Sequence, residues 1–375
     1  MELDFTAEQD MLREMVRGLC ASASSLETVR DLEDDPVGYS ADLWRQLGEL
    51  DLIGLMLPEE YGGSGMGALE GCVVYEEFGR ALVASPHFVS AVMGAGCLLR
   101  SGSEDQRARH VGNIAAGTSI FTTAWLEPSG GFNPRGIRTT ATADGDGFRL
   151  DGEKWHVPFA SSATQIIVLA RTGDGESDID LFMVDPRDEG VSFAQQFTLA
   201  SENQYAVTLS GVHVHAAERI GAAGSGWATW NDALLEGAIF LAANAIGGAR
   251  AALDTTIQYA KDREQFDKPL GAFQAISHYL ADASAAVEGG EILVHEAAWA
   301  AANDQPIEQL APMAKLFAGR TYRDVTAMGE QVHGGVGFTL EYDIQLYFRR
   351  AKQQQISWWD DRALEDRIAA AVLDG

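Results

Sequence analysis

The amino-acid sequence predicts a mainly α-helical protein with one β-domain: an N-terminal helical domain, a middle β-barrel or β-sandwich, and a C-terminal four-helix bundle. Two changes in the spacing of apolar residues predict this order. The spacing is helical through residues 1–117, has a period of two through residues 118–223, and is helical again through residues 224–375. A chain of 375 residues is also too long for one core of ordinary size. We therefore expect three domains with these boundaries.

The N-terminal domain is expected to open on an amphipathic helix. Thr6 and Gln9 have the spacing of a capping box, which satisfies free backbone N–H groups at the start of a helix. Apolar residues then recur at helical intervals: Met11, Leu12, Met15, Val16 and Leu19. Similar patterns predict helices near residues 42–52, 68–82 and 103–116.

Short strands separated by glycine and aspartate turns are expected in the middle domain. The clearest runs are residues 165–170, 180–184 and 205–209. The segment Gly147–Trp155 is expected to form a strand, a turn and a second strand. His213 and His215 would share one strand face, but no third and fourth ligand are evident nearby in the sequence, so no metal site is expected.

Three long helical segments, joined by short connections, predict the antiparallel bundle. They cover residues 229–263, 273–303 and 307–332. The most apolar stretch, residues 233–253, carries charged side chains and is dominated by alanine and glycine. This composition suits a helix packed inside a bundle better than a lipid-facing one, so no membrane span is expected.

Charge and cysteine content narrow the class of protein. A formal net charge of −28 would repel nucleic acid and anionic lipid, so neither is an expected partner. The same charge requires local arginines, helix N-termini or backbone amides to hold any anionic cofactor or coenzyme A ester. The acidic start Met1–Phe5 does not resemble a secretory signal, and Cys20, Cys72 and Cys97 are too few and too widely spaced for a disulfide framework. We expect a cytoplasmic protein.

Two segments of the predicted bundle carry a more specific signal. The first contains Arg263-Glu-Gln-Phe266-Asp-Lys-Pro, and the second contains Gln331-Val-His-Gly334-Gly335-Val-Gly-Phe. Together they resemble the acyl-CoA dehydrogenase family of FAD enzymes, whose signature pairs Arg-x-x-Phe-Gly-x-Pro with Gln-x-x-Gly-Gly-x-Gly-Phe. The resemblance extends over nearly the whole chain.

The resemblance implies FAD as cofactor and a set of cofactor contacts. These are Arg263, Phe266, Gln274, Gln331, Gly334 and Gly335, which in the family reach the FAD of the neighbouring subunit. It therefore also implies a homo- or hetero-oligomer, commonly a dimer of dimers. An arginine at a helix end can grip a pyrophosphate with two hydrogen bonds, although spacing alone would favour a surface salt bridge for Arg263. Glycines let the backbone approach a ligand closely.

The middle domain departs from the family pattern. Where the family has Thr-Glu-Pro-Gly-x-Gly-Ser-Asp, this chain has Leu-Glu127-Pro-Ser129-Gly-Gly-Phe-Asn, which retains only part of the motif. Where the family has Trp-Ile-Thr-Asn, this chain has His156-Val-Pro158-Phe, so proline replaces a threonine hydroxyl expected near the flavin. By resemblance, Glu127, His156 and Pro158 are expected near the cofactor.

The family reaction needs a carboxylate that removes a proton α to the thioester while a hydride leaves the β-carbon. The usual glutamate position is Trp358 here, and a second family position for the base is Gly237. Glu236 is one residue away, which is a rotation of ~100° on a helix. Asp360, with Asp361, is a further candidate. The alternative for all three acids is a solvated or helix-capping role.

Three functions remain open at this stage. The first is an FAD-dependent acyl-CoA dehydrogenase of lipid metabolism that passes electrons to an electron-transfer flavoprotein. The second is a non-catalytic partner subunit of a hetero-oligomeric acyl-CoA dehydrogenase, which the missing glutamate favours. The third is a flavin oxidase or monooxygenase on the same scaffold, for which Asp360 would be the acid. The identity of the acyl group does not follow from the sequence.

Overall fold

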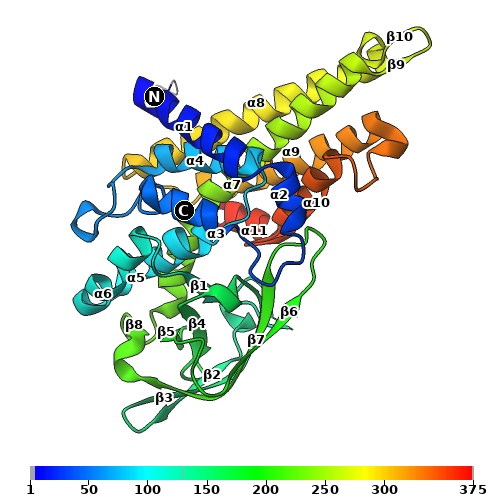
Figure 1. Ribbon diagram of the computed structural model, residues 1–375. Helices are drawn as coiled ribbons and strands as arrows, with labels where there is room; N and C mark the ends of the chain where they lie inside the picture. The colour runs from blue at the N-terminus through cyan, green and yellow to red at the C-terminus, as the bar shows by residue number, and fades with distance from the viewer. Residues whose placement is uncertain (1–4, 129, 374–375) are drawn as a thin grey trace. The chain divides into compact units, whose positions relative to one another are not determined.

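The computed structural model describes residues 5–128 and 130–373, which form two compact units (Figure 1). The first unit contains Met1–Arg30, Gly67–Val83 and Ala238–Gly375; the second contains Asp31–Met66 and Ala84–Gly237. The acidic residues 1–4 and Ser129 of the Glu-Pro segment lie outside the described residues. The fold class is confirmed: helices, a middle β-domain and a C-terminal helix bundle follow one another along the chain. The domain boundaries at 117 and 223 stay a prediction.

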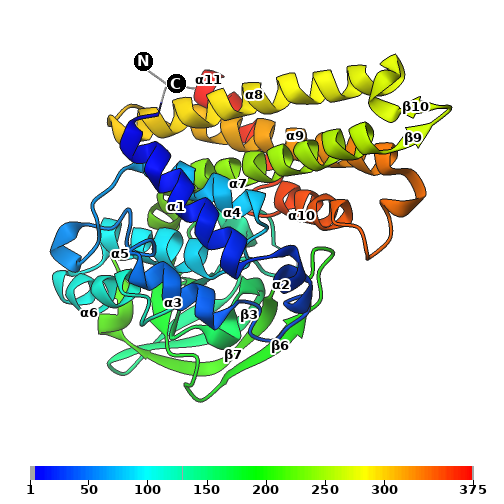
Figure 2. The ribbon, with the colours of Figure 1, turned by 45° about the horizontal axis from the view of Figure 1, so that its top comes forward.

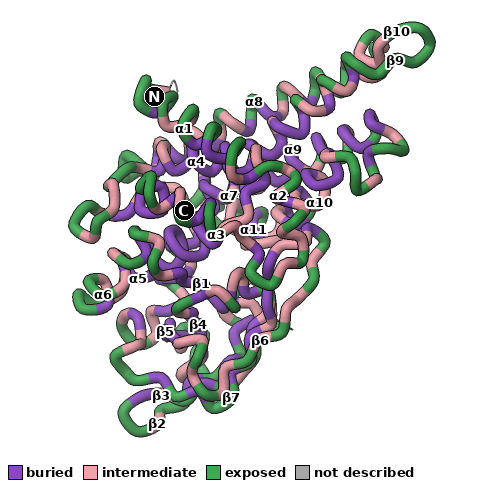
Figure 3. The backbone as a smooth tube through the Cα atoms, viewed as in Figure 1, coloured by how far each residue is buried: buried purple, intermediate pink, exposed green. Residues whose placement is uncertain are grey.

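The first unit is helical, and its long helices α7, α8 and α9 run side by side (Figure 2). Its elements are α1 (Ala7–Ala23), α2 (Leu26–Asp31), α4 (Ala68–Arg80), most of α7 (Gly226–Asp262), α8 (Gln274–Ala302), α9 (Leu310–His333), α10 (Ile344–Ile356) and α11 (Asp361–Leu373). Buried residues follow α9 along its length, as expected of a helix inside a bundle (Figure 3).

Helix α1 begins as its sequence predicts. The Thr6 hydroxyl accepts a hydrogen bond from the Gln9 N–H at 3.3 Å, and the Gln9 side chain accepts one from the Thr6 N–H at 2.9 Å. The same helix is tied to α4 by a two-bond contact from Arg17 to the buried Glu77 carboxylate. The capping box therefore sets where the helix starts, and the ion pair helps set which element it packs against.

Small residues allow α4 and α7 to pack at very short range. A β-carbon added to Gly79 would lie 1.8 Å from the Asn244 carbonyl oxygen, and one added to Gly247 would lie 1.9 Å from the Glu76 carbonyl oxygen. This close approach explains the glycine and alanine content of the apolar stretch 233–253. Among the described helices, α7 alone is long and apolar enough to cross a membrane, and 72% of its most apolar window is buried, which marks it as a core helix.

The second unit is built on one mixed eight-stranded sheet in the order β6-β7-β3-β2-β4-β5-β8, with β1 paired to β4. The strands are β1 (Phe121–Ala124), β2 (Thr140–Asp144), β3 (Gly147–Pro158), β4 (Gln165–Arg171), β5 (Ile179–Val184), β6 (Val191–Gln196), β7 (Gln204–His215) and β8 (Arg219–Ile220). The unit also holds α3 (Ala41–Glu49), a π-helical segment (Phe88–Gly94), α5 (Ala95–Ser101), α6 (Glu104–Ala115) and the first residues of α7. Its core consists of apolar side chains from one face of the strands, Phe182 and Val207 among them.

The turn expected within Gly147–Trp155 is wrong. Strand β3 runs through this segment without a break, and it pairs with β7 with a register shift between Leu150 and Gly152. The Asp151 carboxylate accepts a hydrogen bond from the Gly211 N–H at 2.7 Å and so fills the gap in the ladder. An Asp-Gly pair is a turn signal in isolation, but here the pairing with β7 makes it a bulge.

The three cysteines are free and buried, as expected. Burial raises the pKa of the Cys20 and Cys97 thiols to about 12, so both remain protonated at neutral pH. They behave as small apolar core residues.

Candidate cofactor-binding and catalytic site

A hairpin at the end of α7 presents Arg263 and Phe266 to solvent. Strands β9 (Glu264–Gln265) and β10 (Lys268–Pro269) pair across a two-residue turn in which Phe266 and Asp267 have φ of 54° and 61°. The Phe266 ring is 86% exposed. The Arg263 guanidinium forms no hydrogen bond or ion pair with the residues that the structure describes, so the surface salt bridge that spacing would favour is not formed. It is available to an anionic ligand.

The glycine-rich turn after α9 leaves its backbone open. Gly334 has φ 66° and ψ −142°, a conformation that side-chain-bearing residues rarely adopt. A β-carbon added to Gly334 or Gly335 would meet nothing within 4 Å. Gln331, one turn earlier, is exposed. A ligand can therefore reach the main chain of this turn, as it does in phosphate-binding loops.

One aromatic contact brings the two motifs together within the first unit. The Tyr259 ring stacks on the His333 imidazole with 4.2 Å between centroids, and the Tyr259 hydroxyl donates to the His333 carbonyl at 3.4 Å. Arg263 follows Tyr259 by one helical turn, and Gly334 follows His333 directly. The ends of α7 and α9 are therefore adjacent, and the predicted contacts from both segments gather at one end of the unit (Figure 2).

A buried carboxyl group lies beneath the glycine-rich turn. Glu330 is 3% exposed, and neither of its carboxyl oxygens has a hydrogen-bond partner among the described residues. A β-carbon added to Gly337 would lie 2.5 Å from one of these oxygens. Burial raises the pKa of Glu330 from 4.5 to about 7. The sequence carries no signal for this residue, because the burial of Glu330 and of its neighbours Thr326 and His333 depends on the packing of α9.

In the second unit, Glu127 is held by its own sheet. Its carboxylate accepts hydrogen bonds from the Lys154 ammonium at 2.7 Å and from the N–H groups of Arg138 and Thr139, both at 2.9 Å. The Lys154 side chain is fully buried, which lowers its pKa to about 8 against the opposing charge of Glu127. Burial would raise the pKa of Glu127, but the charge and hydrogen bond of Lys154 more than offset this and lower it. A cofactor contact for Glu127 stays a prediction.

His156 and Pro158 lie where β3 ends. His156 has φ 55°, its Nδ1 lies 2.9 Å from the Gln204 amide oxygen, and its N–H donates to the Gln196 amide oxygen at 2.7 Å. The Pro158 carbonyl accepts a hydrogen bond from the Thr122 hydroxyl at 2.6 Å. Both residues are therefore fixed by neighbouring strands, and their place beside a flavin stays a prediction.

Each of the three candidate acids has a structural partner. Glu236 forms an ion pair with Arg100 of α5. The Asp360 carboxylate accepts a hydrogen bond from the Ala363 N–H at 2.9 Å and so caps α11. Asp361 accepts from the Arg320 guanidinium and from the Gln355 amide, both at 3.0 Å. The assignment of any of them as a base stays a prediction.

The helix register separates Glu236 from Gly237. A β-carbon added to Gly237 would lie 3.1 Å from the Phe88 ring of the π-helical segment, whereas Glu236 is directed to Arg100. The two positions therefore face different neighbours, as a rotation of ~100° per residue requires. Glu236 does not occupy the direction that a side chain at position 237 would take.

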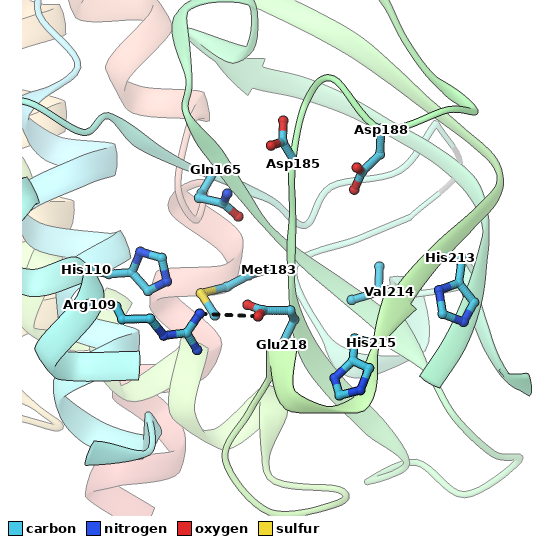
Figure 4. A pocket seen from close by; sticks show the side chains of 10 residues that line it. All are labelled: Arg109, His110, Gln165, Met183, Asp185, Asp188, His213, Val214, His215 and Glu218. Atoms are coloured by element: carbon cyan, nitrogen blue, oxygen red, sulfur yellow. Dashed lines mark hydrogen bonds and ion pairs between the residues drawn. The ribbon is translucent and has the colours of Figure 1, made fainter. Parts of the chain in front are cut away.

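A pocket of about 190 Å³ lies on the second unit, and none of the predicted cofactor or catalytic residues lines it (Figure 4 shows the residues that do). It is lined by Arg109, His110, Gln165, Met183, Asp185, Asp188, His213, Val214, His215 and Glu218. Arg109 pairs with Glu218, while His213 and His215 both face Asp146 at 3.4 and 3.6 Å. No cluster of histidine, cysteine or acidic residues suited to a metal ion occurs in the described part of the chain.

Sequence models of three domains of one family match the chain in order. The acyl-CoA dehydrogenase N-terminal, middle and C-terminal domains match residues 6–118, 122–212 and 224–372. The chain belongs to the acyl-CoA dehydrogenase family. The probable acyl-CoA dehydrogenase YngJ of Bacillus subtilis is 33% identical to it, with 95% of each chain covered.

Two other similar proteins belong to complexes, as their names state. Subunit CarC of the caffeyl-CoA reductase-Etf complex of Acetobacterium woodii is 28% identical, with 92% of this chain and 93% of that chain covered. A chain in the crystal structure of the ChsE4-ChsE5 complex from Mycobacterium tuberculosis is 28% identical, with 100% of each chain covered and a TM-score of 0.90.

The family makes this chain a flavoprotein of the oxidoreductase class that acts on CH–CH groups, with FAD as cofactor. The residues present fit that cofactor: the free Arg263 guanidinium and the open main chain of Gly334 and Gly335 are the donors that a pyrophosphate needs. The tyrosine–histidine stack explains why both donors lie at one end of the unit.

Replacing Arg263 should weaken FAD binding. We expect Arg263→Gln to weaken binding roughly tenfold to a hundredfold, because a hydrogen bond to a charged group contributes about 1.5–3 kcal/mol. The matched control is Lys261→Gln, which removes an exposed cation two residues away. FAD affinity of the apoprotein, measured by flavin fluorescence, checks this. Equal losses in the two variants would show that Arg263 supplies only general charge.

The buried Glu330 should make stability depend on pH. Its folded pKa of about 7 lies above its unfolded value of 4.5, so its contribution to stability is present below pH 4.5 and is lost as pH rises through 7. We expect Glu330→Gln to match the parent at about pH 4 and to exceed it by up to about 3 kcal/mol at about pH 8. Chemical denaturation at both pH values measures this, and a pH-independent difference would contradict it.

Proposed function

We propose that this chain is a subunit of an FAD-dependent acyl-CoA dehydrogenase that oxidises the α,β-bond of an acyl-CoA thioester and passes electrons to an electron-transfer flavoprotein. The observation that carries the proposal is the stacking of Tyr259 on His333, which places the free Arg263 and the open glycine turn at one end of the same unit. When bound, FAD supplies the acceptor for the hydride that leaves the β-carbon.

In this proposal the chain holds the cofactor phosphates by local donors. A net charge of −28 repels an anionic cofactor and a coenzyme A ester alike, so attraction must come from nearby groups. Arg263 would grip the pyrophosphate, while the N–H groups of Gly334 and Gly335 and the exposed amides of Gln274 and Gln331 add hydrogen bonds.

The proposed assembly is an oligomer, because the cofactor contacts of the first unit face outwards. Apolar side chains beside them are also exposed, with Phe266 at 86% and both Phe338 and Leu340 at 71%. Such a surface suits cover by a second chain. The name of the ChsE4-ChsE5 complex supports an unlike partner, and that of the caffeyl-CoA reductase-Etf complex supports an electron-transfer flavoprotein. A cytoplasmic location is part of this proposal.

Three acids are candidates for the base in this proposal. Glu236 is the strongest of the three acids, because it is partly exposed and has one partner, whereas Asp361 has two and Asp360 caps a helix. Glu236 must leave Arg100 to accept a proton from substrate. The alternative is a non-catalytic subunit whose sister chain supplies the base, and the structural engagement of all three acids favours it.

Flavin content and acyl-CoA titration test the proposed function. The chain is purified alone and also co-expressed with a related acyl-CoA dehydrogenase from the same source, and each sample is titrated anaerobically with a panel of acyl-CoAs. We expect at least one thioester to bleach the flavin absorbance and an electron-transfer flavoprotein to restore it.

The samples separate the alternatives. Bleaching by the chain alone supports a self-sufficient enzyme, and bleaching only after co-expression supports the partner-subunit function. Direct oxygen consumption with no acceptor protein would favour an oxidase or monooxygenase. No bleaching by any thioester in either sample would contradict the proposal.

Conservative amide variants test the base. We expect Glu236→Gln to slow anaerobic flavin reduction by roughly 10²- to 10⁴-fold, the usual contribution of a general base. Asp360→Asn tests the second candidate, and because asparagine caps a helix as well as aspartate the start of α11 is kept. A large loss in Asp360→Asn with none in Glu236→Gln would assign the base to Asp360, and no loss in either would favour the partner-subunit function.

A further inference from the structure

Lys315 is a buried lysine that neither the family motifs nor the reaction proposed above uses. It lies on α9, is 5% exposed, and donates hydrogen bonds from its ammonium group to the carbonyls of Ser357 at 2.9 Å and Trp359 at 2.8 Å. Burial lowers its pKa to about 8, against the opposing charges of Asp361 and Asp360. Burying a cation raises the free energy of the folded protein, so we asked what its hydrogen bonds to these two carbonyls achieve.

The segment that Lys315 holds has an unusual backbone. Trp358 and Trp359 are consecutive and have φ of 56° and 85°. A left-handed conformation costs a bulky residue roughly 1–3 kcal/mol and persists only where the surroundings enforce it. Both carbonyls that Lys315 binds flank residue 358, so the ammonium group spans the strained segment.

The far side of the same segment is fixed by other contacts. The Arg367 guanidinium lies 3.5 Å from the centre of the Trp359 ring, and Trp359 is completely buried. Asp360 caps α11 through the Ala363 N–H. Trp359 is therefore locked, whereas Trp358 between the two bound carbonyls is only partly buried. The contacts of Lys315 on either side therefore determine the backbone at 358.

We propose that Lys315 is a positioning residue that clamps the Ser357 and Trp359 carbonyls and thereby directs the side chain at position 358 toward the acyl thioester. This inference rests on the proposed function, because position 358 aligns with the glutamate that most members of the family use as base. In this proposal the clamp holds the backbone at 358 as a catalytic base would need it, although the side chain at 358 is an indole. A carboxylate placed at 358 should therefore become a working base only while Lys315 holds the loop.

The test uses the FAD-loaded protein, with a sister chain if flavin loading requires one. Trp358→Glu is made in a Glu236→Gln chain, so that the candidate base of the parent does not contribute, and again in that chain with Lys315→Met; Lys352→Met is the matched control. Lys352 is an exposed lysine of α10 that bonds to Gln355 and not to the loop carbonyls. Two quantities are measured: amide hydrogen exchange of residues 357–361, and the rate of anaerobic flavin reduction per bound flavin.

We expect Lys315→Met to speed exchange in residues 357–361 by roughly tenfold or more, while Lys352→Met leaves it unchanged. We expect Trp358→Glu to speed flavin reduction by roughly 10²-fold or more, and this gain to fall below tenfold in the Lys315→Met background. The rate is expressed per bound flavin, so protein that has failed to fold does not lower it. If Lys315→Met does not fold, Lys315→Gln, which keeps an uncharged N–H₂ group as donor on a shorter side chain, takes its place.

Unchanged exchange in the Lys315 variants would overturn the clamp. The positioning role would be overturned if Trp358→Glu did not speed flavin reduction with Lys315 intact, or sped it equally in both backgrounds. Failure of the proposed function is distinct, because it would appear as no flavin reduction by any thioester in the parent and Trp358→Glu assemblies, while the exchange measurement still reports on the clamp.

Discussion

The stacking of Tyr259 on His333 is the contact on which the candidate cofactor site depends. It joins the C-terminal ends of two helices whose motifs are about seventy residues apart in the chain. Arg263 and Gly334 each follow a member of this pair by no more than one helical turn, so their positions follow from it. The hairpin and the glycine turn then present a free cation and open amides to the same side, which is what a pyrophosphate requires.

Three buried titratable groups lie beside predicted site segments. Lys154 pairs with Glu127, Lys315 binds two carbonyls, and Glu330 has no partner among the described residues. Desolvation makes each costly, and each perturbed pKa follows from that cost.

The candidate carboxylates are all engaged in structural contacts. Position 358 carries an indole, and the acids that follow it serve as a helix cap and as acceptors for Arg320 and Gln355. Glu236, in the second unit, is paired with Arg100. An assembly in which one chain lends cofactor contacts and another lends the base is consistent with these engagements.

The sequence by itself determined the fold class, the start of α1, the long bundle helices and the family, because apolar period, capping boxes and glycine-arginine motifs are local patterns. It misread Asp151-Gly152 as part of a turn, since a bulge exists only once β7 pairs alongside. It could not show that Arg263 is free, that Glu330 is buried or that Lys315 spans residue 358, since those depend on partners from distant segments. Only the tertiary structure decided them, because burial and hydrogen bonding are set by what packs alongside a residue and not by its neighbours in sequence.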